Sequence, residues 1–293
     1  MTARYDAIGI GFGPSNLALA IALEERGDTG RMRFFERQEC FGWHRDMLLP
    51  DATLQVNHLK DLVTLRDPRS SFSFVNYLHE QGRLIDDINL TTSFPTRLEF
   101  HDYLQWAAAR VAPVCDYGAE VVGVRPVGDG DRVDALAVDI VRGGVRESVE
   151  TDSIVVENVS RVERVVDATD GVTQTIRDES RGTSRELEVD AVVFATGYEP
   201  VSVDDLLPAL AGRFARDERG RVIVERDYRL RTDDAFAPAV YLQGGTEHTH
   251  GLTSSLLSAV AVRAGEIAES LDARRVRGHR GALAGALVGN GVS

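Results

Sequence analysis

Hydrophobic and polar positions follow two regular patterns in the first 36 residues of the chain. Ala7, Ile8 and Ile10 form an apolar run of the kind found in a buried parallel strand. Leucine, isoleucine and alanine then recur through residues 17–23 at the spacing of a helix with one apolar face. A second apolar run at residues 32–35 predicts another strand. The chain is therefore predicted to open as strand, turn, helix and strand.

The turn between the first strand and the helix carries glycines at the positions of a dinucleotide-binding fingerprint. Gly11 allows the tight turn, and Gly13 lets a pyrophosphate approach the backbone at the helix N-terminus. Asn16 stands where the third glycine usually lies, which relaxes the demand for close helix and strand packing. Glu36 follows Asn16 by about 20 residues, the spacing expected for a carboxylate that binds ribose hydroxyls. The motif predicts a nucleotide and leaves FAD and NAD open, because both carry ribose and pyrophosphate.

The middle of the chain, from about residue 111 to residue 190, alternates between apolar and polar residues. Turn signals such as Gly143-Gly144 divide it, so a series of antiparallel strands is predicted. The region closes with an apolar run that enters a glycine turn at Thr196 and Gly197.

The C-terminal region predicts a helix followed by a loose tail. Thr253 and Ser254 are good N-cap residues, so the helix is expected to begin there. Residues 274–293 are small and glycine-rich, which predicts a disordered tail. His248 and His250 lack a third ligand at a suitable spacing, and no metal site is predicted.

Composition excludes several classes of protein. The chain of 293 residues is 43% hydrophobic and has a net charge of -13, which argues against nucleic acid or an anionic membrane surface as a partner. No run resembles a membrane span or a secretion leader, so a cytoplasmic location is expected. Cys40 and Cys115 form no CxxC pair, which argues against a dithiol relay like that of flavin-dependent disulfide reductases.

Long blocks of sequence also carry a family resemblance. They include FFERQECFGWHRDMLLPDATLQVNHLKDLVTLRDP in the N-terminal region, and FATGYEP and YLQGGTEHTHGLTSSLLSAVAVRAGEI in the C-terminal region. These blocks closely resemble the flavin-dependent N-hydroxylating monooxygenases of siderophore biosynthesis, and most of all the L-ornithine N5-monooxygenases. The resemblance covers about the first 150 residues and the last 110.

The resemblance implies FAD at the N-terminal turn, NADPH as reductant, and hydroxylation of the side-chain amine of L-ornithine by a C4a-hydroperoxyflavin. L-Lysine is the alternative substrate. The flavin carries the chemistry, so no catalytic acid or base is assigned. The resemblance places substrate at Lys60 and Ser258, although Lys60 would equally serve as a solvated loop residue, and Phe41 and Trp43 as core aromatics. The FAD contacts that it implies are Gly11, Gly13, Pro14, Ser15, Asn16, Glu36, Arg37, Phe41, Gly42, Trp43, His44, Gln55, Val121, Thr196, Gly197, Ser255, Leu256 and Leu257.

One part of that family has no counterpart in the sequence. Its members carry a second dinucleotide domain, for NADPH, after the strand that corresponds to residues 153–156. We therefore expect an α/β fold, a GR2-type FAD-binding Rossmann domain with an antiparallel β segment and no NADPH domain. The expected boundaries are 1–156 and 157–273 for the two parts of the FAD-binding domain, and 274–293 for the tail.

Three functional hypotheses follow from this reading. In the first, the chain is a monooxygenase that is reduced by residual NADPH binding or by a separate reductase. In the second, it is an uncoupled flavoprotein that releases hydrogen peroxide. In the third, it is a non-catalytic FAD-binding protein. The resemblance also implies self-association, as a tetramer.

Overall fold

The structure, a computed structural model, describes residues 3–27, 31–44, 48–157, 172–178, 183–189, 202–254 and 256–289. The chain divides into two compact units. The first consists of Met1–Asn158 and Ser202–Ser293, and the second of Val159–Val201.

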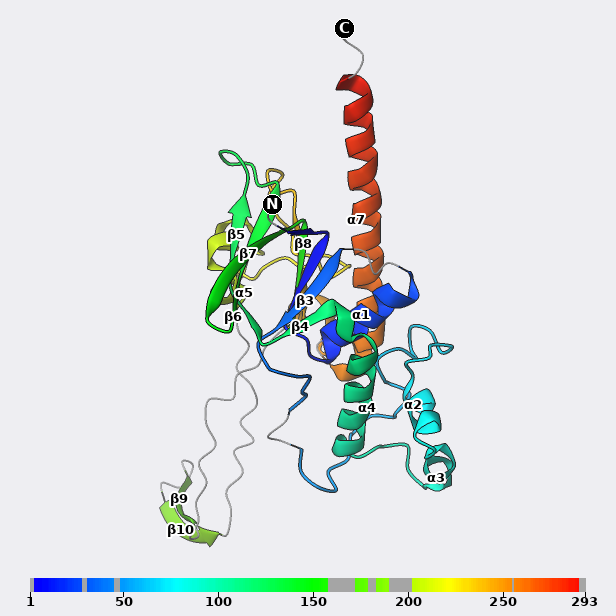
Figure 1. The fold of residues 1–293 in the computed structure, drawn as a ribbon. Coiled ribbons are helices and arrows are strands. Elements are labelled where there is room, and N and C mark those ends of the chain that lie inside the picture. Colours follow the sequence, from blue (N-terminus) through cyan, green and yellow to red (C-terminus); the bar gives the residue numbers. More distant parts are fainter. Residues whose placement is uncertain are drawn as a thin grey trace. The chain divides into compact units, whose positions relative to one another are not determined.

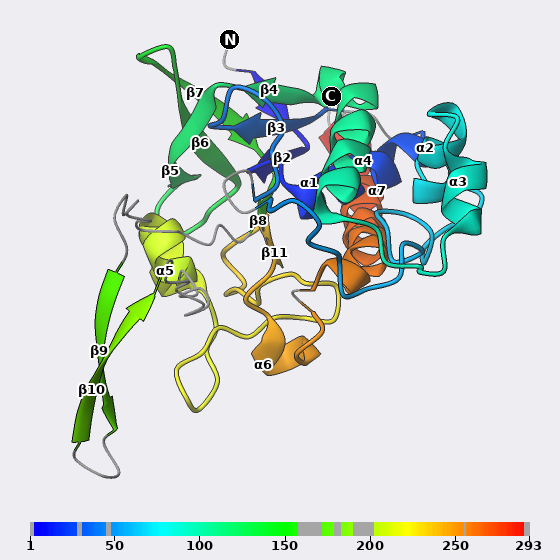
Figure 2. The same cartoon turned by 90° about the horizontal axis from the view of Figure 1, so that it is seen from below.

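A five-stranded parallel sheet forms the centre of the first unit (Figure 2). Its strands lie in the order β11 (Ala239–Gln243), β8 (Ser153–Glu157), β2 (Ala7–Ile10), β3 (Met32–Glu36) and β4 (Cys115–Tyr117). Gly9 of β2 is needed for close packing, because a Cβ atom there would lie 2.1 Å from the ring of Phe34. The predicted strands at residues 7–10 and 32–35 are confirmed, and the parallel order brings the carboxyl ends of all five strands to one edge.

Helices pack on one side of this sheet, as Figures 1 and 2 show. α1 (Pro14–Glu25) packs against α7 (Val260–Gly289) and α4 (Arg97–Arg110). α2 (Phe74–Glu80) and α3 (Leu84–Asn89) precede α4, and α2 contributes Phe74 and Tyr77 to an aromatic cluster around Tyr103. The side chains of Ser73 and Thr96 cap α2 and α4 by accepting backbone N–H bonds.

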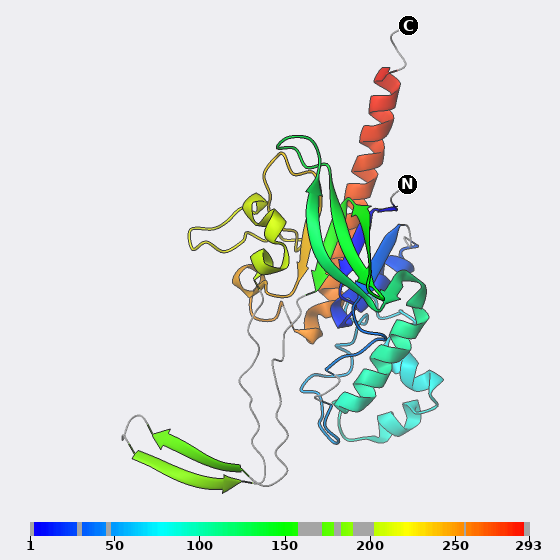
Figure 3. The same cartoon turned by 60° about the vertical axis from the view of Figure 1, so that its left-hand side comes forward.

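An antiparallel sheet lies on the other side of the parallel sheet (Figures 1 and 2), and its curved green strands are clear in Figure 3. The order is β1 (Arg4–Tyr5), β7 (Val145–Thr151), β6 (Ala135–Arg142) and β5 (Ala119–Val127), with β1 parallel to β7. β6 buries Leu136, Val138 and Ile140 in a second core shared with β8 and β11. The antiparallel strands predicted for residues 111–190 are confirmed for β5, β6 and β7, but the prediction is wrong for β4 and β8, which pair in parallel in the other sheet.

Short elements complete the first unit. They are η2 (Ala112–Val114), α5 (Val203–Leu206), η3 (Pro208–Arg213), α6 (Glu247–His250) and η4 (Leu257–Ala259). The second unit contains β9 (Val172–Asp178) and β10 (Thr183–Val189), which pair as an antiparallel hairpin.

The C-terminal helix differs from the prediction at both ends. It begins at Val260, not at Thr253 or Ser254, because a turn and the 3-10 helix η4 come first. It continues to Gly289, past the point where a disordered tail was predicted, and its alanine and leucine residues favour helix. Within the described residues, no helix is both long and apolar enough to cross a membrane.

Candidate dinucleotide-binding site

The glycine turn joins β2 to α1 at the carboxyl edge of the parallel sheet. Gly11 has a φ of +81°, in the left-handed region that favours glycine, and its N–H donates to the carbonyl of Phe35 at 2.9 Å. Gly13 is the N-cap of α1, and Pro14 takes the first helical position, where a missing N–H costs nothing. The backbone of the predicted fingerprint is therefore confirmed, and it aims the N–H groups of a helix start at one point.

The carboxylate of Glu157, at the end of β8, accepts hydrogen bonds from the start of α1. The donors are the N–H groups of Gly13 at 2.7 Å, Ser15 at 3.1 Å and Asn16 at 3.4 Å. Burial raises the pKa of Glu157, and these backbone hydrogen bonds oppose that rise because they favour the ionised form. An anion thus sits where the fingerprint is expected to hold a pyrophosphate.

Glu36, at the end of β3, binds the same turn from the other side of β2. Its Oε2 accepts from the N–H of Phe12 at 2.7 Å, and its Oε1 accepts from the N–H of Gln38 at 2.9 Å. The predicted acid at the strand end is therefore in place. Since Pro14 has no N–H, every amide N–H from residue 12 to residue 16 is bound to a carboxylate of the chain.

Asn16 is fully buried and ties the turn to β11. Its amide nitrogen donates to the carbonyls of Gly11 at 2.8 Å and Ile10 at 3.2 Å. Its Oδ1 accepts from the Nε2 of Gln243 at 2.7 Å. At the position of the third glycine, the Asn16 side chain thus links the helix to the strand through hydrogen bonds.

Arg263 of α7 supplies the positive charge of the site. Its side chain is 1% exposed, and it donates to the Oγ of Ser15 at 2.9 Å and to the carbonyl of Ser254. Burial lowers the pKa of Arg263, and nearby Glu157 acts in the opposite direction. Its Nε has no hydrogen-bond partner among the described residues. Sequence analysis assigned no role to Arg263, although it lies in the C-terminal block that carries the family resemblance, or to Glu157, which lies in no motif.

The residues predicted near the flavin ring pack against the start of α4. Phe41 is buried in the main core, and Trp43 packs half-buried against it. The Trp43 ring lies 5.9 Å from that of Phe100, and the Arg97 guanidinium lies 5.2 Å from the Trp43 ring centre. Burial, reinforced by the charge of Arg97, lowers the pKa of His44. Phe41 and Trp43 thus serve as core aromatics, which is compatible with a cofactor role.

Other predicted contacts are dispersed over the first unit. Arg37, Gln55 and Lys60 are exposed, and Val121 lies half-buried on β5. Leu256, Leu257 and Ser258 lie two to four residues after Ser254, which is linked to Ser15 through Arg263. Within the described residues, no hydrogen bond or ring contact joins Gly42, Gln55, Lys60 or Val121 to the turn. Thr196, Gly197 and Ser255 lie outside the described residues.

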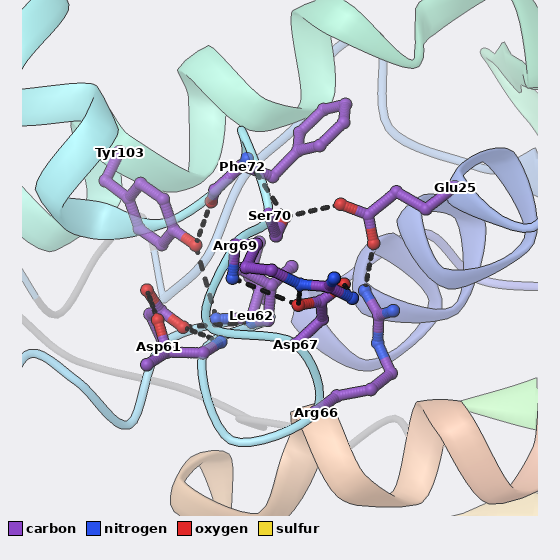
Figure 4. Close-up of polar contacts among 11 residues, drawn as sticks. Glu25, Asp61, Leu62, Arg66, Asp67, Arg69, Ser70, Phe72 and Tyr103 are labelled. Carbon is purple, nitrogen blue, oxygen red and sulfur yellow. Dashed lines mark hydrogen bonds and ion pairs between the residues drawn. The ribbon is translucent and has the colours of Figure 1, made fainter.

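The loop after Lys60 is held by buried polar contacts, shown in Figure 4. Asp61 is 1% exposed, and its carboxylate accepts from the N–H groups of Val63 at 2.9 Å and Phe74 at 2.7 Å. The hydroxyl of Tyr103 accepts from the N–H of Leu62 at 3.2 Å and donates to the carbonyl of Phe72 at 2.9 Å. Further along the loop, Glu25 of α1 binds Arg66 and Ser70. These contacts hold the backbone of the loop that follows Lys60.

The two histidines have structural partners. A ring nitrogen of His248 lies 2.8 Å from the carbonyl oxygen of Val222, and His250 stacks on Tyr228 with ring centres 4.2 Å apart. No group of three or more potential metal ligands occurs in the part of the chain that the structure describes.

Comparisons with known proteins give a consistent result. A sequence profile of the L-lysine 6-monooxygenase/L-ornithine 5-monooxygenase family matches residues 3–159. An L-ornithine N(5)-monooxygenase of Burkholderia cepacia is 54% identical over 137 residues, which are 46% of this chain and 31% of that protein. An L-ornithine N(5)-monooxygenase of Pseudomonas aeruginosa is 28% identical over an alignment of 418 residues that covers 91% of this chain and 93% of the relative. This chain therefore matches less than a third of the Burkholderia protein's length.

Solved structures agree with the sequence matches. The ornithine N-hydroxylase of Kutzneria sp. 744, with reduced FAD, NADP+ and L-ornithine, has a TM-score of 0.84 at 30% identity, covering 93% of this chain and 100% of that chain. The ornithine hydroxylase of Pseudomonas aeruginosa has a TM-score of 0.81 at 27% identity, with 93% and 100% covered.

Proposed function

The chain belongs to the L-lysine 6-monooxygenase/L-ornithine 5-monooxygenase family, and on that basis we propose that it binds FAD and hydroxylates the side-chain amine of L-ornithine. The observation that carries the proposal is the turn between β2 and α1. Its N–H groups at Gly13, Ser15 and Asn16 converge on an anion, and the buried charge of Arg263 lies beside them. This arrangement suits a pyrophosphate.

Residues of this chain would bind and orient both ligands. The turn would hold the pyrophosphate, and Glu36 would turn from Phe12 to the ribose hydroxyls. Phe41 and Trp43 would exclude water from the flavin side. Bound FAD would supply oxygen activation, with NADPH as the source of electrons.

Lys60 is the proposed partner of the substrate carboxylate. It is exposed, and the buried contacts of Asp61 fix the loop that carries it. An ammonium group suits the carboxylate of an amino acid. Ser258 is proposed to lie closer to the side-chain amine of the substrate than Lys60 does. L-Ornithine and L-lysine differ in the length of the side chain that carries this amine.

A second candidate, an FAD-binding protein that needs a separate reductase or releases peroxide, is favoured by a gap inside the alignment with the Pseudomonas relative. The alignment of 418 residues with the Pseudomonas relative exceeds the 293 residues of this chain by at least 125. A dinucleotide-binding domain needs on the order of 100 residues. Between β8 and α5 the described residues add only the β9–β10 hairpin. Self-association as a tetramer is a further proposal, which light scattering tests.

The test is anaerobic reduction of the FAD-loaded protein by NADPH, followed by oxygen and L-ornithine or L-lysine. Hydroxylated L-ornithine, detected by mass spectrometry, supports the first function. Peroxide equal to the oxygen consumed, or reduction only by an added reductase, supports the second. Lys60→Gln should raise the KM for L-ornithine without changing FAD affinity, and Lys60→Arg should retain most of the binding. Equal KM values for the three proteins would remove Lys60 from the substrate site.

A further inference from the structure

The position of Glu157 against the glycine turn is unusual for a site proposed to hold a dinucleotide. Its Oε1 lies where a side chain on residue 13 would project, because a Cβ atom built on Gly13 would be 2.5 Å from it. The fingerprint uses glycine there so that a pyrophosphate can approach the backbone. The carboxylate therefore fills the space that the glycine leaves open.

Carboxylate and pyrophosphate also need the same hydrogen-bond donors. Glu157 accepts from Gly13, Ser15 and Asn16, and the remaining N–H of the turn, that of Phe12, is bound to Glu36. A phosphate at this point would meet a like charge at close range with no free amide to bind.

Sheet order explains why a residue so distant in sequence reaches the turn. β8 lies next to β2 and parallel to it, and the register pairs Ile10 with Val156, so Glu157 is level with Gly11, the first residue of the turn. A side chain at this strand end faces the N-terminus of α1. Arg263 lies close enough for its charge to interact with that of Glu157, so the carboxylate balances the charge of both the helix start and the arginine.

We infer that Glu157 is an internal competitor of the dinucleotide pyrophosphate, so that FAD binds only when this carboxylate leaves the N-terminus of α1. The inference rests on the proposed use of the turn for FAD. A purely structural role for Glu157, as a cap of α1, makes a different prediction: its removal would lower stability and leave FAD affinity unchanged or weaker.

The experiment measures the Kd of FAD for the apoprotein by calorimetry, in the wild type and four variants. Glu157→Ala frees the three N–H groups and should tighten FAD binding at least tenfold. Glu157→Gln removes the charge but keeps an acceptor, so a smaller gain is expected. Glu36→Gln makes the same change on the other carboxylate of the turn and should weaken FAD binding. Glu120→Gln changes an exposed residue of β5 and should leave FAD affinity unchanged.

Inorganic pyrophosphate provides a readout that does not depend on the flavin. It should raise the Tm of Glu157→Ala more than that of the wild type, and the Tm without ligand reports whether each variant is folded. Equal FAD affinity in the wild type and both Glu157 variants would overturn the inference and leave the proposed function standing. If neither FAD nor pyrophosphate bound any of the proteins, both would be overturned.

Discussion

Replacing Asn16 by glycine would restore the third glycine of the dinucleotide fingerprint, and we nevertheless expect it to destabilise the protein. The side chain of Asn16 is fully buried and makes three hydrogen bonds. Its removal leaves the carbonyls of Gly11 and Ile10 and the amide of Gln243 without this partner. The Oε1 of Gln243 already lacks a partner among the described residues, so no other contact compensates there.

The magnitude follows from these groups. A buried polar group that loses its partner costs about 1–3 kcal/mol. The two shorter hydrogen bonds, to Gly11 at 2.8 Å and from Gln243 at 2.7 Å, account for most of the expected loss in the free energy of unfolding. Glycine adds only about 0.3 kcal/mol, because asparagine is itself a poor helix former. We therefore expect Asn16→Gly to lower the free energy of unfolding by about 3–5 kcal/mol.

Urea unfolding followed by tryptophan fluorescence measures this loss, and Asn76→Gly is the matched control. Asn76 occupies the third position of α2 just as Asn16 occupies the third position of α1, but its side-chain bonds to Ser71 and Glu80 lie at the surface. The control should cost less than about 1 kcal/mol, because asparagine and glycine differ little in helix propensity. Equal losses in the two variants would refute the reasoning.

Two further predictions concern buried polar groups elsewhere in the first unit. Tyr103→Phe removes a hydroxyl that satisfies two buried backbone groups and should cost about 2–4 kcal/mol in urea unfolding. Tyr77→Phe, in the same aromatic cluster, should cost less than about 1 kcal/mol, and equal costs would contradict the assignment. Hydrogen bonding by Arg125 holds the pKa of Asp139 well below its usual range, so its stabilisation is present above the unfolded-state pKa near 4 and is lost as pH falls through the folded-state value. Asp139→Asn should therefore be less stable than the wild type by about 1–2 kcal/mol at pH 7, with a gap that closes in acid; a gap independent of pH would contradict this.

Local patterns predicted the parts of the site that are local in sequence. The turn at Gly11 and Gly13, the strands on either side and the acid at position 36 all follow from periodicity and spacing within one strand–helix–strand unit. The start of α7 was misplaced because Ser254 is a good N-cap by type, yet its carbonyl accepts a hydrogen bond from Arg263 and the helix begins later. Propensity at one residue did not outweigh this tertiary contact.

The residues that sequence reasoning missed reach the turn from other parts of the chain. Glu157 is 144 positions from Gly13, and Arg263 is 248 positions from Ser15. No spacing rule connects such pairs, because their proximity depends on β8 lying beside β2 and on α7 packing against α1. Asn16 belongs with them, since its partner Gln243 lies on β11.

Whether this turn accepts a phosphate is therefore decided by the ends of the strands beside it. A glycine fingerprint fixes the backbone, and the backbone offers N–H groups to any anion. In a parallel sheet the neighbouring strands end at the same edge, so their last side chains compete with a ligand for those groups. Here β3 ends in Glu36, β8 in Glu157 and β11 in Gln243, and all three are within hydrogen-bond reach of the turn or of Asn16. Gln243 carries no charge and Glu36 can move to a ribose, so Glu157 is the one side chain whose charge and position both oppose the pyrophosphate.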